Sequence, residues 1–463
     1  MQFDAVIVGG GIAGLAAAYE LSRRNVSFLV VEERSRAGGV ILSEHIDGYT
    51  IDGGPDSLIV QKPEGVALCR ELGLGDRLVP TIPPRLAYIQ RGGRLHALPA
   101  ASVMGIPTKF GPFIRTKLFS WPGKIRMGAE LFVPAKKDDG DESIGSFIGR
   151  RFGREAVEYL AEPLLAGIHA GDVDKLSMRA LFPRFVDAER KHGSLLRAFA
   201  NPPSQTPNSD GVFRSLPGGL SELVDALVHV LPRESIALGA AVERIDAGGS
   251  DFCVHIANRP TIRARTAVVA VPAYAASAMV RGVDPDLSSA CGSVPYASAA
   301  TVALAFDRSA VRHPLTGSGY VVPRAENPAI LAASWLSSKW PNRAPQGKVL
   351  MRTFIGGARD PRALDQPDTE LVQLSLDALT PILGITAPPL FTRIYRWNRA
   401  NAQHDVGHLA RMQSIERALA KHPGLFVTGS GFRGVGIPDC IADGRATGKA
   451  VASFLTTASP VDG

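Results

Sequence analysis

The chain has 463 residues, of which 45% are hydrophobic and 21% charged, and its formal net charge is +7. This length allows two or three domains, and the composition is that of a globular protein. No apolar run reaches the roughly 18 residues of a membrane-spanning helix. The basic residues are not gathered in one tail and no nucleic-acid-binding motif occurs, so the charge favours an anionic substrate or lipid over nucleic acid.

The four cysteines predict neither a disulfide framework nor a metal site. They are Cys69, Cys253, Cys291 and Cys440, and none of them forms a C-x-x-C pair. Scattered cysteines of this kind are typical of reduced thiols. The apolar N-terminus also lacks the basic region of a signal peptide. We therefore expect a cytoplasmic protein, as a monomer or a homodimer.

Residues 3–32 read FDAVIVGGGIAGLAAAYELSRRNVSFLVVE and predict a βαβ unit. Phe3–Val8 is a short apolar, β-branched run, as expected of a strand buried on both faces. Ile12–Arg24 has the alanine and leucine content of a helix, and Phe28–Val31 is a second apolar run. The length of the unit is that of a dinucleotide-binding fold.

Three glycines in this unit have the G-x-G-x-x-G spacing. Gly9 allows a tight turn, Gly11 lets a diphosphate approach the backbone, and Gly14 lets helix and strand pack closely. The helix N-terminus offers free N–H groups to phosphate, and Glu32 can accept hydrogen bonds from a ribose. A glycine-rich turn without a ligand is the alternative, but the complete unit favours dinucleotide binding.

The residues after the second strand favour FAD over NAD. Glu32 is followed by Arg36 and by the pair Gly38–Gly39, and a second glycine pair begins the GGPDS turn at 53–57. Glycines at these places let the chain pass close to a bound flavin nucleotide. The pattern resembles flavoproteins of the amine-oxidase type.

The other elements follow in chain order. We expect a helix within 62–78 that ends near Gly73 or Gly75, a hairpin at 85–99 turning at Gly92–Gly93, a mostly helical region to about 199 and a loop at 201–211. Further along we expect a helix at 216–231, strands at 241–245, 266–271, 299–306, 320–323, 330–335 and 349–355, a helix at 368–383, a strand at 425–428 and a helix at 437–455.

This order predicts an α/β protein with a Rossmann-like FAD-binding domain of the amine-oxidase type. The FAD-binding domain would be assembled from residues 1–84, 212–290 and 391–463. A substrate domain with a mixed sheet would contain the hairpin at 85–99 and residues 291–390. Residues 100–211 would form a mostly helical insertion.

Residues 100–135 mix aromatic and aliphatic side chains with lysines and arginines, and Glu130 is their only acid. Such a segment can lie on an anionic membrane surface, here the inner face of the membrane, as a peripheral contact. It can also wall a pocket for a flat anion, or form helices that simply pack on one another.

The C-terminal region predicts a second anion-facing turn. A strand, the glycine-rich turn GSGFRGVG at 429–436 and a helix N-terminus follow one another, and such a turn can stabilise negative charge on a reduced flavin ring. The turn contains no cysteine that could tether a flavin, and Cys440 lies beyond it. FAD is therefore expected to be noncovalent.

Motifs along nearly the whole chain resemble the porphyrinogen oxidases of haem biosynthesis. They are VIVGGGIAGLAAAYEL, GGPDS, PLLAGIHAGDVDKLSMRA, SLPGGLSEL, WPNRAPQGKVLMRTFIGGARD and GVGIPDCIADGR. That family contains the oxygen-dependent protoporphyrinogen oxidases and the bacterial coproporphyrinogen III oxidases. The phrase MGIPTK at 104–109, with the GPDS turn, resembles the coproporphyrinogen branch.

The resemblance implies an oxidoreductase that removes six electrons from a porphyrinogen in three rounds, with FAD as cofactor and dioxygen as acceptor. The products would be a porphyrin and hydrogen peroxide. Coproporphyrinogen III is the expected substrate and protoporphyrinogen IX the alternative. More distant alternatives are an amine oxidase or carotenoid desaturase-like enzyme and a non-catalytic FAD-stabilised partner protein.

The resemblance also assigns cofactor residues. They are Gly9, Gly10, Gly11, Ile12, Ala13, Gly14, Glu32, Glu33, Arg36, Gly39, Val40, Gly54, Pro55, Asp56, Ser57, Val242, Trp397, Gly434, Val435, Gly436 and Ile437.

On the substrate side, the resemblance implies that Trp340 stacks on a pyrrole ring and that the Gly167 carbonyl accepts pyrrole N–H bonds, with Arg85 and Val321 nearby. Where many family members have an arginine that holds a propionate, this chain has Ala87. His169 is interpreted as a core histidine, with pocket wall as the alternative. No catalytic base and no metal ligand is assigned.

Overall fold

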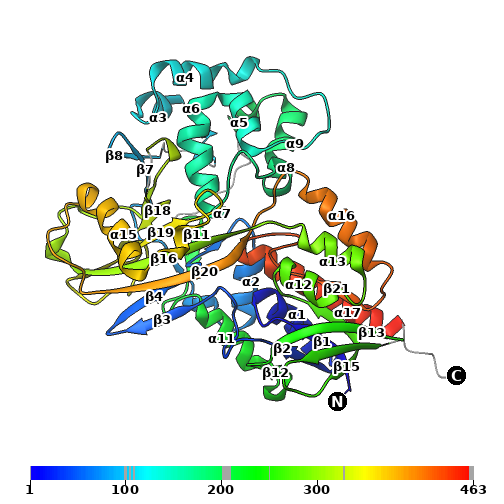
Figure 1. Cartoon of the computed structure of the whole chain (residues 1–463). Coiled ribbons are helices and arrows are strands. Elements are labelled where there is room, and N and C mark those ends of the chain that lie inside the picture. Colours follow the sequence, from blue (N-terminus) through cyan, green and yellow to red (C-terminus); the bar gives the residue numbers. More distant parts are fainter. Residues whose placement is uncertain are drawn as a thin grey trace.

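The computed structural model describes residues 2–98, 102–103, 106–107, 110–200, 210–249, 251–326 and 329–457. The MGIPTK phrase and the loop at 201–211 lie largely outside these residues. Two seven-stranded sheets stand side by side, and most helices of residues 110–200 lie above them (Figure 1). The α/β class expected from the sequence is confirmed.

The first sheet has the order β12-β2-β1-β15-β14-β13, with β21 also paired to β15. Its strands are β1 (Gln2–Val8), β2 (Phe28–Val31), β12 (Ile236–Ala237), β13 (Val242–Gly248), β14 (Asp251–Ile256), β15 (Ile262–Val269) and β21 (Leu425–Val427). The pairs of β1 with β2 and β15, and of β15 with β21, are parallel. All four residues of β2 are buried, as the continuous apolar run predicts.

Helices cover both faces of the first sheet. One apolar cluster contains residues of α1, α2, α11 and α17, and the opposite cluster contains residues of α12, α13 and α16. These helices are α1 (Ile12–Ser22), α2 (Glu64–Glu71), α11 (Ser221–Val230), α12 (Ala273–Val280), α13 (Pro285–Gly292), α16 (His408–Leu419) and α17 (Ile437–Thr457). The helix expected to end near Gly73 or Gly75 is α2, which ends at Glu71 just before Gly73 with its positive φ of 76°.

The second sheet has the order β20-β16-β19-β18-β17-β7-β8. Its strands are β7 (Ala87–Arg91), β8 (Arg94–Ala97), β16 (Tyr296–Asp307), β17 (Gly319–Val321), β18 (Ala332–Ser334), β19 (Lys348–Gly356) and β20 (Phe391–Ala402). Helix α15 (Asp368–Leu383), predicted with these bounds, packs on it. The predicted hairpin is confirmed as β7–β8, with φ values of 57° and 68° at Gly92 and Gly93.

Strand β20 corrects one expected boundary. It pairs with β16 from Tyr296–Ala402 to Ala305–Phe391, so residues 391–402 belong to the second sheet rather than to the third FAD-binding segment. The charged residues of FTRIYRWNRANA hid this strand, because an edge strand leaves one row of side chains in solvent. The chain returns to the first sheet only after residue 402.

Further short elements lie along the chain between the helices and strands of the two sheets. They are β3 (Ser43–Ile46), β4 (Tyr49–Asp52), β5 (Leu58–Ile59), β6 (Val79–Pro80), β11 (Phe213–Ser215), α14 (Leu336–Lys339) and the 3₁₀ turns η1 (Gly75–Arg77), η4 (Arg233–Ser235), η5 (Arg308–Ala310), η6 (Arg324–Glu326) and η7 (Ala363–Asp365).

The helical part has its own apolar core. It contains α3 (Phe110–Arg115), α4 (Trp121–Gly128), η2 (Ala129–Phe132), α5 (Ile144–Phe152), α6 (Arg154–Ala156), the π-helix η3 (Val157–Ala166), α7 (Gly167–His169), α8 (Met178–Leu181), α9 (Pro183–His192), α10 (Leu195–Ala200) and the short pair β9 (Ser102–Val103) and β10 (Ile106–Pro107).

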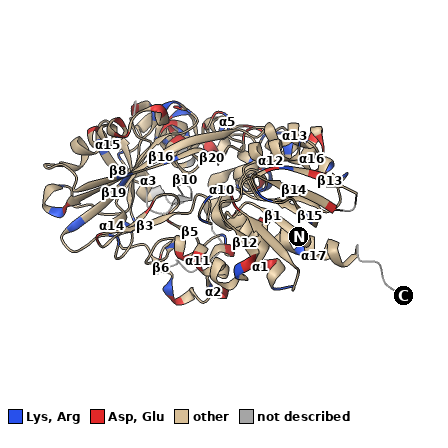
Figure 2. Ribbon diagram, turned by 60° about the horizontal axis from the view of Figure 1, so that its bottom comes forward, with Lys and Arg blue, Asp and Glu red and all other residues tan. Residues whose placement is uncertain are grey.

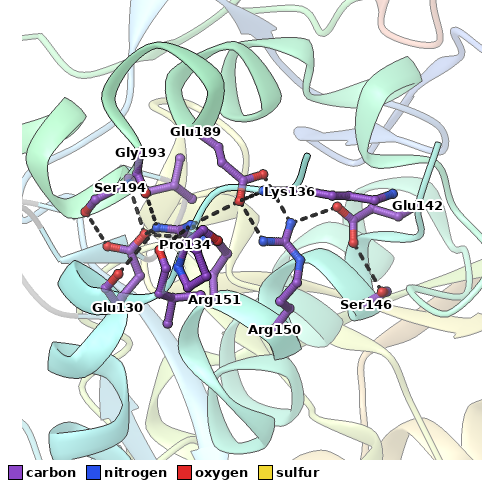
Figure 3. A network of polar contacts seen from close by, with 12 residues as sticks. Glu130, Pro134, Lys136, Glu142, Ser146, Arg150, Arg151, Glu189, Gly193 and Ser194 are labelled. Atoms are coloured by element: carbon purple, nitrogen blue, oxygen red, sulfur yellow. Dashed lines mark hydrogen bonds and ion pairs between the residues drawn. The ribbon is translucent and has the colours of Figure 1, made fainter. Parts of the chain in front are cut away.

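A buried ion network holds the helical part together (Figure 3). The side chains of Glu130 and Arg151 are fully buried and form an ion pair. Arg151 also contacts Glu189 at 3.0 Å, and Glu130 accepts hydrogen bonds from Ser194 Oγ at 2.5 Å and the Leu195 N–H at 2.8 Å. The acid that stood alone in the basic segment therefore links η2 to α5 and the start of α10, and Arg151 extends the network to α9.

Lysines and arginines are interspersed with acids over the whole fold (Figure 2). Within the described ranges, no helix is both long and apolar enough to span a membrane.

Candidate functional site

The N-terminal glycine turn has the geometry that its sequence predicts. Gly9 has a φ of 109°, which favours glycine. A Cβ on Gly14 would lie 2.0 Å from the Gly9 carbonyl oxygen, so only glycine lets α1 pack on the turn. A Cβ on Gly11, in contrast, would meet no atom within 4 Å. Open space beside Gly11 is what a diphosphate at this turn requires.

The start of α1 can hold that diphosphate. Gly11 is its N-cap, no side chain caps the helix, and its first turn, which begins with Ile12 and Ala13, contains no acid. The first N–H groups of a helix lack partners inside the helix and attract anions. The residues present therefore fit a dinucleotide.

Glu32 lies at the end of β2 with 7% of its surface exposed. Its Oε2 accepts the Gly10 N–H at 2.7 Å and its Oε1 accepts the Arg34 N–H at 2.9 Å. Each carboxylate oxygen can accept a further hydrogen bond. The Glu32 carbonyl accepts the Ala240 N–H at 2.8 Å, which brings the chain before Val242 beside it, whereas Glu33 is exposed.

The pair Gly38–Gly39 lies directly on the N-terminal glycine turn. The Gly38 N–H donates to the Gly10 carbonyl at 2.8 Å, and a Cβ on Gly39 would lie 3.4 Å from Gly11 Cα. Arg36 Nη2 donates to the Gly39 carbonyl at 2.7 Å. Burial lowers the pKa of Arg36. In this structure Arg36 shapes the loop through backbone carbonyls.

The GGPDS turn continues this surface. A Cβ on Gly54 would lie 1.9 Å from the Val40 carbonyl oxygen, so Val40 and the turn touch through their backbones. Two side chains of the second sheet hold the turn: Thr301 Oγ1 and Trp397 Nε1 donate to the Gly53 carbonyl at 2.7 and 2.8 Å. The expected cofactor residues at 9–14, 39–40 and 54, with Trp397, thus lie together.

Asp56 is an internal anchor of the same turn. It is 5% exposed, and its carboxylate accepts hydrogen bonds from Lys339 Nζ at 2.9 Å, Trp340 Nε1 at 3.3 Å and Ser57 Oγ at 3.1 Å. Burial raises the pKa of Asp56, but Lys339 and Arg352 lower it more, so the pKa stays below its usual range. Asp56 therefore fixes the turn next to Pro55 rather than offering a free carboxylate.

The expected role of Trp340 is wrong in this structure. Its side chain is fully buried in an apolar cluster with Tyr49, Leu336 and Leu350. Its Nε1 is bonded to Asp56. A ring without exposed surface has no face on which a pyrrole could stack. Trp340 is a core residue that supports the GGPDS turn.

The other substrate-side residues fall into two places. Gly167 and Val321 are neighbours, because a Cβ on Gly167 would lie 3.9 Å from Val321 Cγ1. Arg85 is exposed, lies two residues before β7 and donates from Nε to Thr81 Oγ1 at 3.2 Å. Gly167 directly follows η3, and π-helical turns are frequent at functional sites.

The C-terminal turn packs against the N-terminal one. A Cβ on Gly429 would lie 3.8 Å from Ala13 Cβ, and a Cβ on Gly444 in α17 would lie 2.2 Å from the Ala13 carbonyl oxygen. Gly434, Val435 and Gly436 precede Ile437, the first residue of α17. The Gly436 N–H donates to Asp439 Oδ2 at 3.2 Å.

Three histidines lie behind the C-terminal turn. Burial lowers the pKa of His169 to about 4 and that of His404 to about 3, and it also lowers the pKa of His408. His169 Nδ1 is buried without a hydrogen-bond partner in the described part of the chain. All three rings are neutral near pH 7, so none supplies positive charge to the site.

Sequence reasoning missed the cations that hold the GGPDS turn. Arg352 Nη1 donates to the Gly54 carbonyl at 2.6 Å, and Arg343 Nη2 contacts Asp52 at 2.9 Å with its side chain fully buried. Burial raises the pKa of Asp52. One signal was present: Arg352 interrupts the apolar strand VLMRTFIG, and a buried arginine needs an acidic or carbonyl partner.

Comparisons with known proteins show the family to which the chain is similar. A sequence profile described as flavin containing amine oxidoreductase matches residues 12–452. The chain is 38% identical to the coproporphyrinogen III oxidase of Bacillus subtilis (strain 168), over 97% of each chain. It is 34% identical to that of Propionibacterium freudenreichii subsp. freudenreichii, over 98% of this chain and 92% of that protein. A crystal structure from Exiguobacterium sp. 255-15, provisionally described as a protoporphyrinogen oxidase, has a TM-score of 0.86 at 31% identity over 98% of both chains.

The chain belongs to the flavin-containing amine oxidoreductases, and within them to the porphyrinogen oxidases that its motifs resemble. It is therefore a flavin-dependent oxidoreductase.

Proposed function

We propose that the protein oxidises coproporphyrinogen III to coproporphyrin III with noncovalently bound FAD and dioxygen, releasing hydrogen peroxide, in the cytoplasm. The observation that supports this substrate is 38% identity to a coproporphyrinogen III oxidase along nearly the full length of both chains. The alternative substrate is protoporphyrinogen IX, which the description of the Exiguobacterium structure favours.

Each part of the site has a role in this proposal. The start of α1 binds the diphosphate, and Glu32 binds the ribose of the adenosine half. The backbone at Gly39–Val40 and Gly54 passes along the cofactor, and the turn at 434–437 faces the flavin ring. Bound FAD would supply a two-electron acceptor. The protein's own contribution is to orient a flat substrate, with the Gly167 carbonyl as acceptor for pyrrole N–H groups, and to exclude water.

Noncovalent binding is supported by the sequence of the C-terminal turn. Cys440 Sγ is buried and lies 3.5 Å from the Gly434 carbonyl oxygen, inside α17, and burial raises the pKa of its thiol to about 12. A protonated buried thiol is unreactive. Acid precipitation is expected to release all flavin into the supernatant, and flavin that stays with the precipitate would contradict this part of the proposal.

An anaerobic titration tests the function. Coproporphyrinogen III is expected to bleach the flavin absorbance within seconds, whereas amines leave it unchanged. In air, kcat/KM is expected to be higher for coproporphyrinogen III than for protoporphyrinogen IX, and the difference should shrink as salt screens the additional propionates. Equal or reversed specificity at low salt would favour the alternative substrate. No reduction by either porphyrinogen would favour a non-catalytic FAD protein, and reduction by amines an amine oxidase.

A basic-aromatic face supports peripheral membrane contact. On α4 and η2, Trp121 is 64%, Ile125 71% and Phe132 84% exposed, and Lys124 Nζ lies 4.7 Å from the centre of the Trp121 ring. Exposed aromatic and aliphatic residues beside lysines are typical of interfacial helices. Co-sedimentation with anionic vesicles, but not with neutral ones, is expected for the wild type. It should be lost in Trp121→Ser/Ile125→Ser, and equal sedimentation of both proteins would refute this contact.

A further inference from the structure

Two stacked histidines lie behind the C-terminal glycine turn, which is defined here as residues 429–436. The ring centres of His404 and His408 are 3.7 Å apart and the ring planes differ by 10°. Each residue is 2% exposed. His404 follows β20 and His408 begins α16, so the pair sits where the chain passes from the second sheet back to the first.

Each histidine is bonded to the backbone of the turn. His404 Nε2 lies 3.0 Å from the Ser430 carbonyl oxygen, and His408 Nε2 lies 2.8 Å from the Phe432 carbonyl oxygen. A carbonyl oxygen only accepts, so both Nε2 atoms carry the hydrogen and both rings act as donors. The neutral rings of the pair can stack without charge repulsion.

The turn needs such support. Four of its eight residues are glycine, and a glycine-rich segment loses much conformational entropy when it is fixed. Carboxylates hold the two ends of the turn, since Asp443 accepts the Gly429 N–H and Asp439 accepts the Gly436 N–H, each at 3.2 Å. Near its middle the chain is tightly packed: a Cβ on Gly431 would lie 2.3 Å from Tyr296 Oη. The two imidazole bonds are side-chain hydrogen bonds to carbonyls in the middle of the turn.

We propose that His404 and His408 are positioning residues, which hold the C-terminal turn against the proposed flavin site. This inference rests on the proposed FAD site. Neither histidine need touch the cofactor, because both act through the Ser430 and Phe432 carbonyls. A neutral imidazole suits this buried place, since a buried lysine or arginine would need its own counter-ion.

The test compares three kinds of substitution at each position. Glutamine places an amide N–H near the position of Nε2, asparagine places it near Nδ1, and leucine has no donor. For each folded variant, the Kd for FAD is measured by flavin fluorescence and the midpoint potential by dye-coupled reduction. The leucine and asparagine variants are expected to bind FAD about tenfold more weakly and to have a lower potential, whereas His404→Gln and His408→Gln stay within about threefold of wild type.

His422→Leu is the matched control. His422 Nε2 pairs with Asp284 at 2.9 Å and has no hydrogen bond to the turn, so its loss is expected to leave the Kd and the potential unchanged. If the leucine variants do not fold, the asparagine and glutamine variants decide: equal Kd values and potentials in both would overturn the inference. Wild-type protein that does not bind FAD would instead refute the proposed function.

Discussion

The two glycine turns face the same region of the molecule but are built in different ways. In the N-terminal turn, the deciding contacts join Gly14 to Gly9 and Gly10 to Glu32, all within one βαβ unit. In the C-terminal turn, they join residues 429–436 to Tyr296, His404 and His408, which are far away in the sequence. The first turn is specified by its own glycine spacing, and the second by tertiary contacts. The variants below separate these two kinds of support.

The largest expected effect belongs to the N-terminal turn. Gly11→Leu is expected to abolish FAD retention while the protein still folds, because the side chain would fill the open space that the diphosphate needs. The flavin absorbance relative to protein absorbance, together with far-UV circular dichroism, measures both properties. Gly14→Leu is the contrast: its Cβ would lie 2.0 Å from the Gly9 carbonyl oxygen, so fold and flavin should be lost together. A yellow Gly11→Leu protein would show that the diphosphate lies elsewhere.

The next largest effect is expected at Glu32, the carboxylate of the same βαβ unit. Glu32→Ala is expected to weaken FAD binding by about 1–3 kcal/mol, the contribution of a charge-assisted hydrogen bond. Part of this loss is indirect, because Glu32 also fixes the Gly10 N–H at 2.7 Å. Glu32→Gln keeps an acceptor for Gly10 and should lose less. Isothermal titration of apoprotein with FAD measures both, and equal losses would place the whole effect in the charge.

The same contrast explains what the sequence could predict. Local rules were sufficient for the first βαβ unit, for the hairpin at Gly92–Gly93 and for α15, whose bounds agree with the prediction. They failed for β20, because an edge strand rich in arginine does not look like a strand. The role of Trp340 came from the family resemblance, and a resemblance places a residue in a motif without showing which way its side chain points.

The stacked histidine pair could not be predicted from the sequence. His404 and His408 lie outside the glycine turn in sequence, and only the tertiary structure brings them to it. Nothing in the segment NAQHDVGH indicates a stacked pair. Long-range support of this kind has no periodicity or spacing that a single sequence can reveal.

The pH dependence of the free energy of unfolding separates the buried histidines from the N-terminal turn. Burial holds the pKa of His404 at about 3 and that of His169 at about 4, below the ordinary value of about 6.5. Between these values the unfolded chain binds protons that the folded chain does not, so the free energy of unfolding falls as pH decreases from about 6.5. Each histidine contributes up to about 1.4 kcal/mol per pH unit.

Urea denaturation at several values between pH 4.5 and 7 measures this slope. His404→Gln is expected to reduce it by up to one histidine's contribution, whereas Gly11→Leu, which removes no titrating group, should keep the wild-type slope. Carboxyl groups titrate in the same range, but they are common to all three proteins and cancel in the comparison. An unchanged slope in His404→Gln would mean that the pKa of His404 is the same in the folded and the unfolded chain.

The smallest expected effect concerns an exposed ion pair at the C-terminal turn. Lys62 Nζ lies 2.6 Å from Asp439 Oδ2, and the Lys62 side chain is 49% exposed. Exposed pairs contribute at most about 1 kcal/mol and are screened by salt. Lys62→Met should therefore lower the free energy of unfolding by less than about 1 kcal/mol in dilute buffer. The loss should be smaller still at about 0.5 M salt, which screens the pair. Asp439→Ala should cost more, because it also removes the acceptor of the Gly436 N–H, and Asp439→Asn should restore that part. A Lys62→Met loss as large as that of Asp439→Ala would show that charge, rather than the backbone contact, holds this end of the turn.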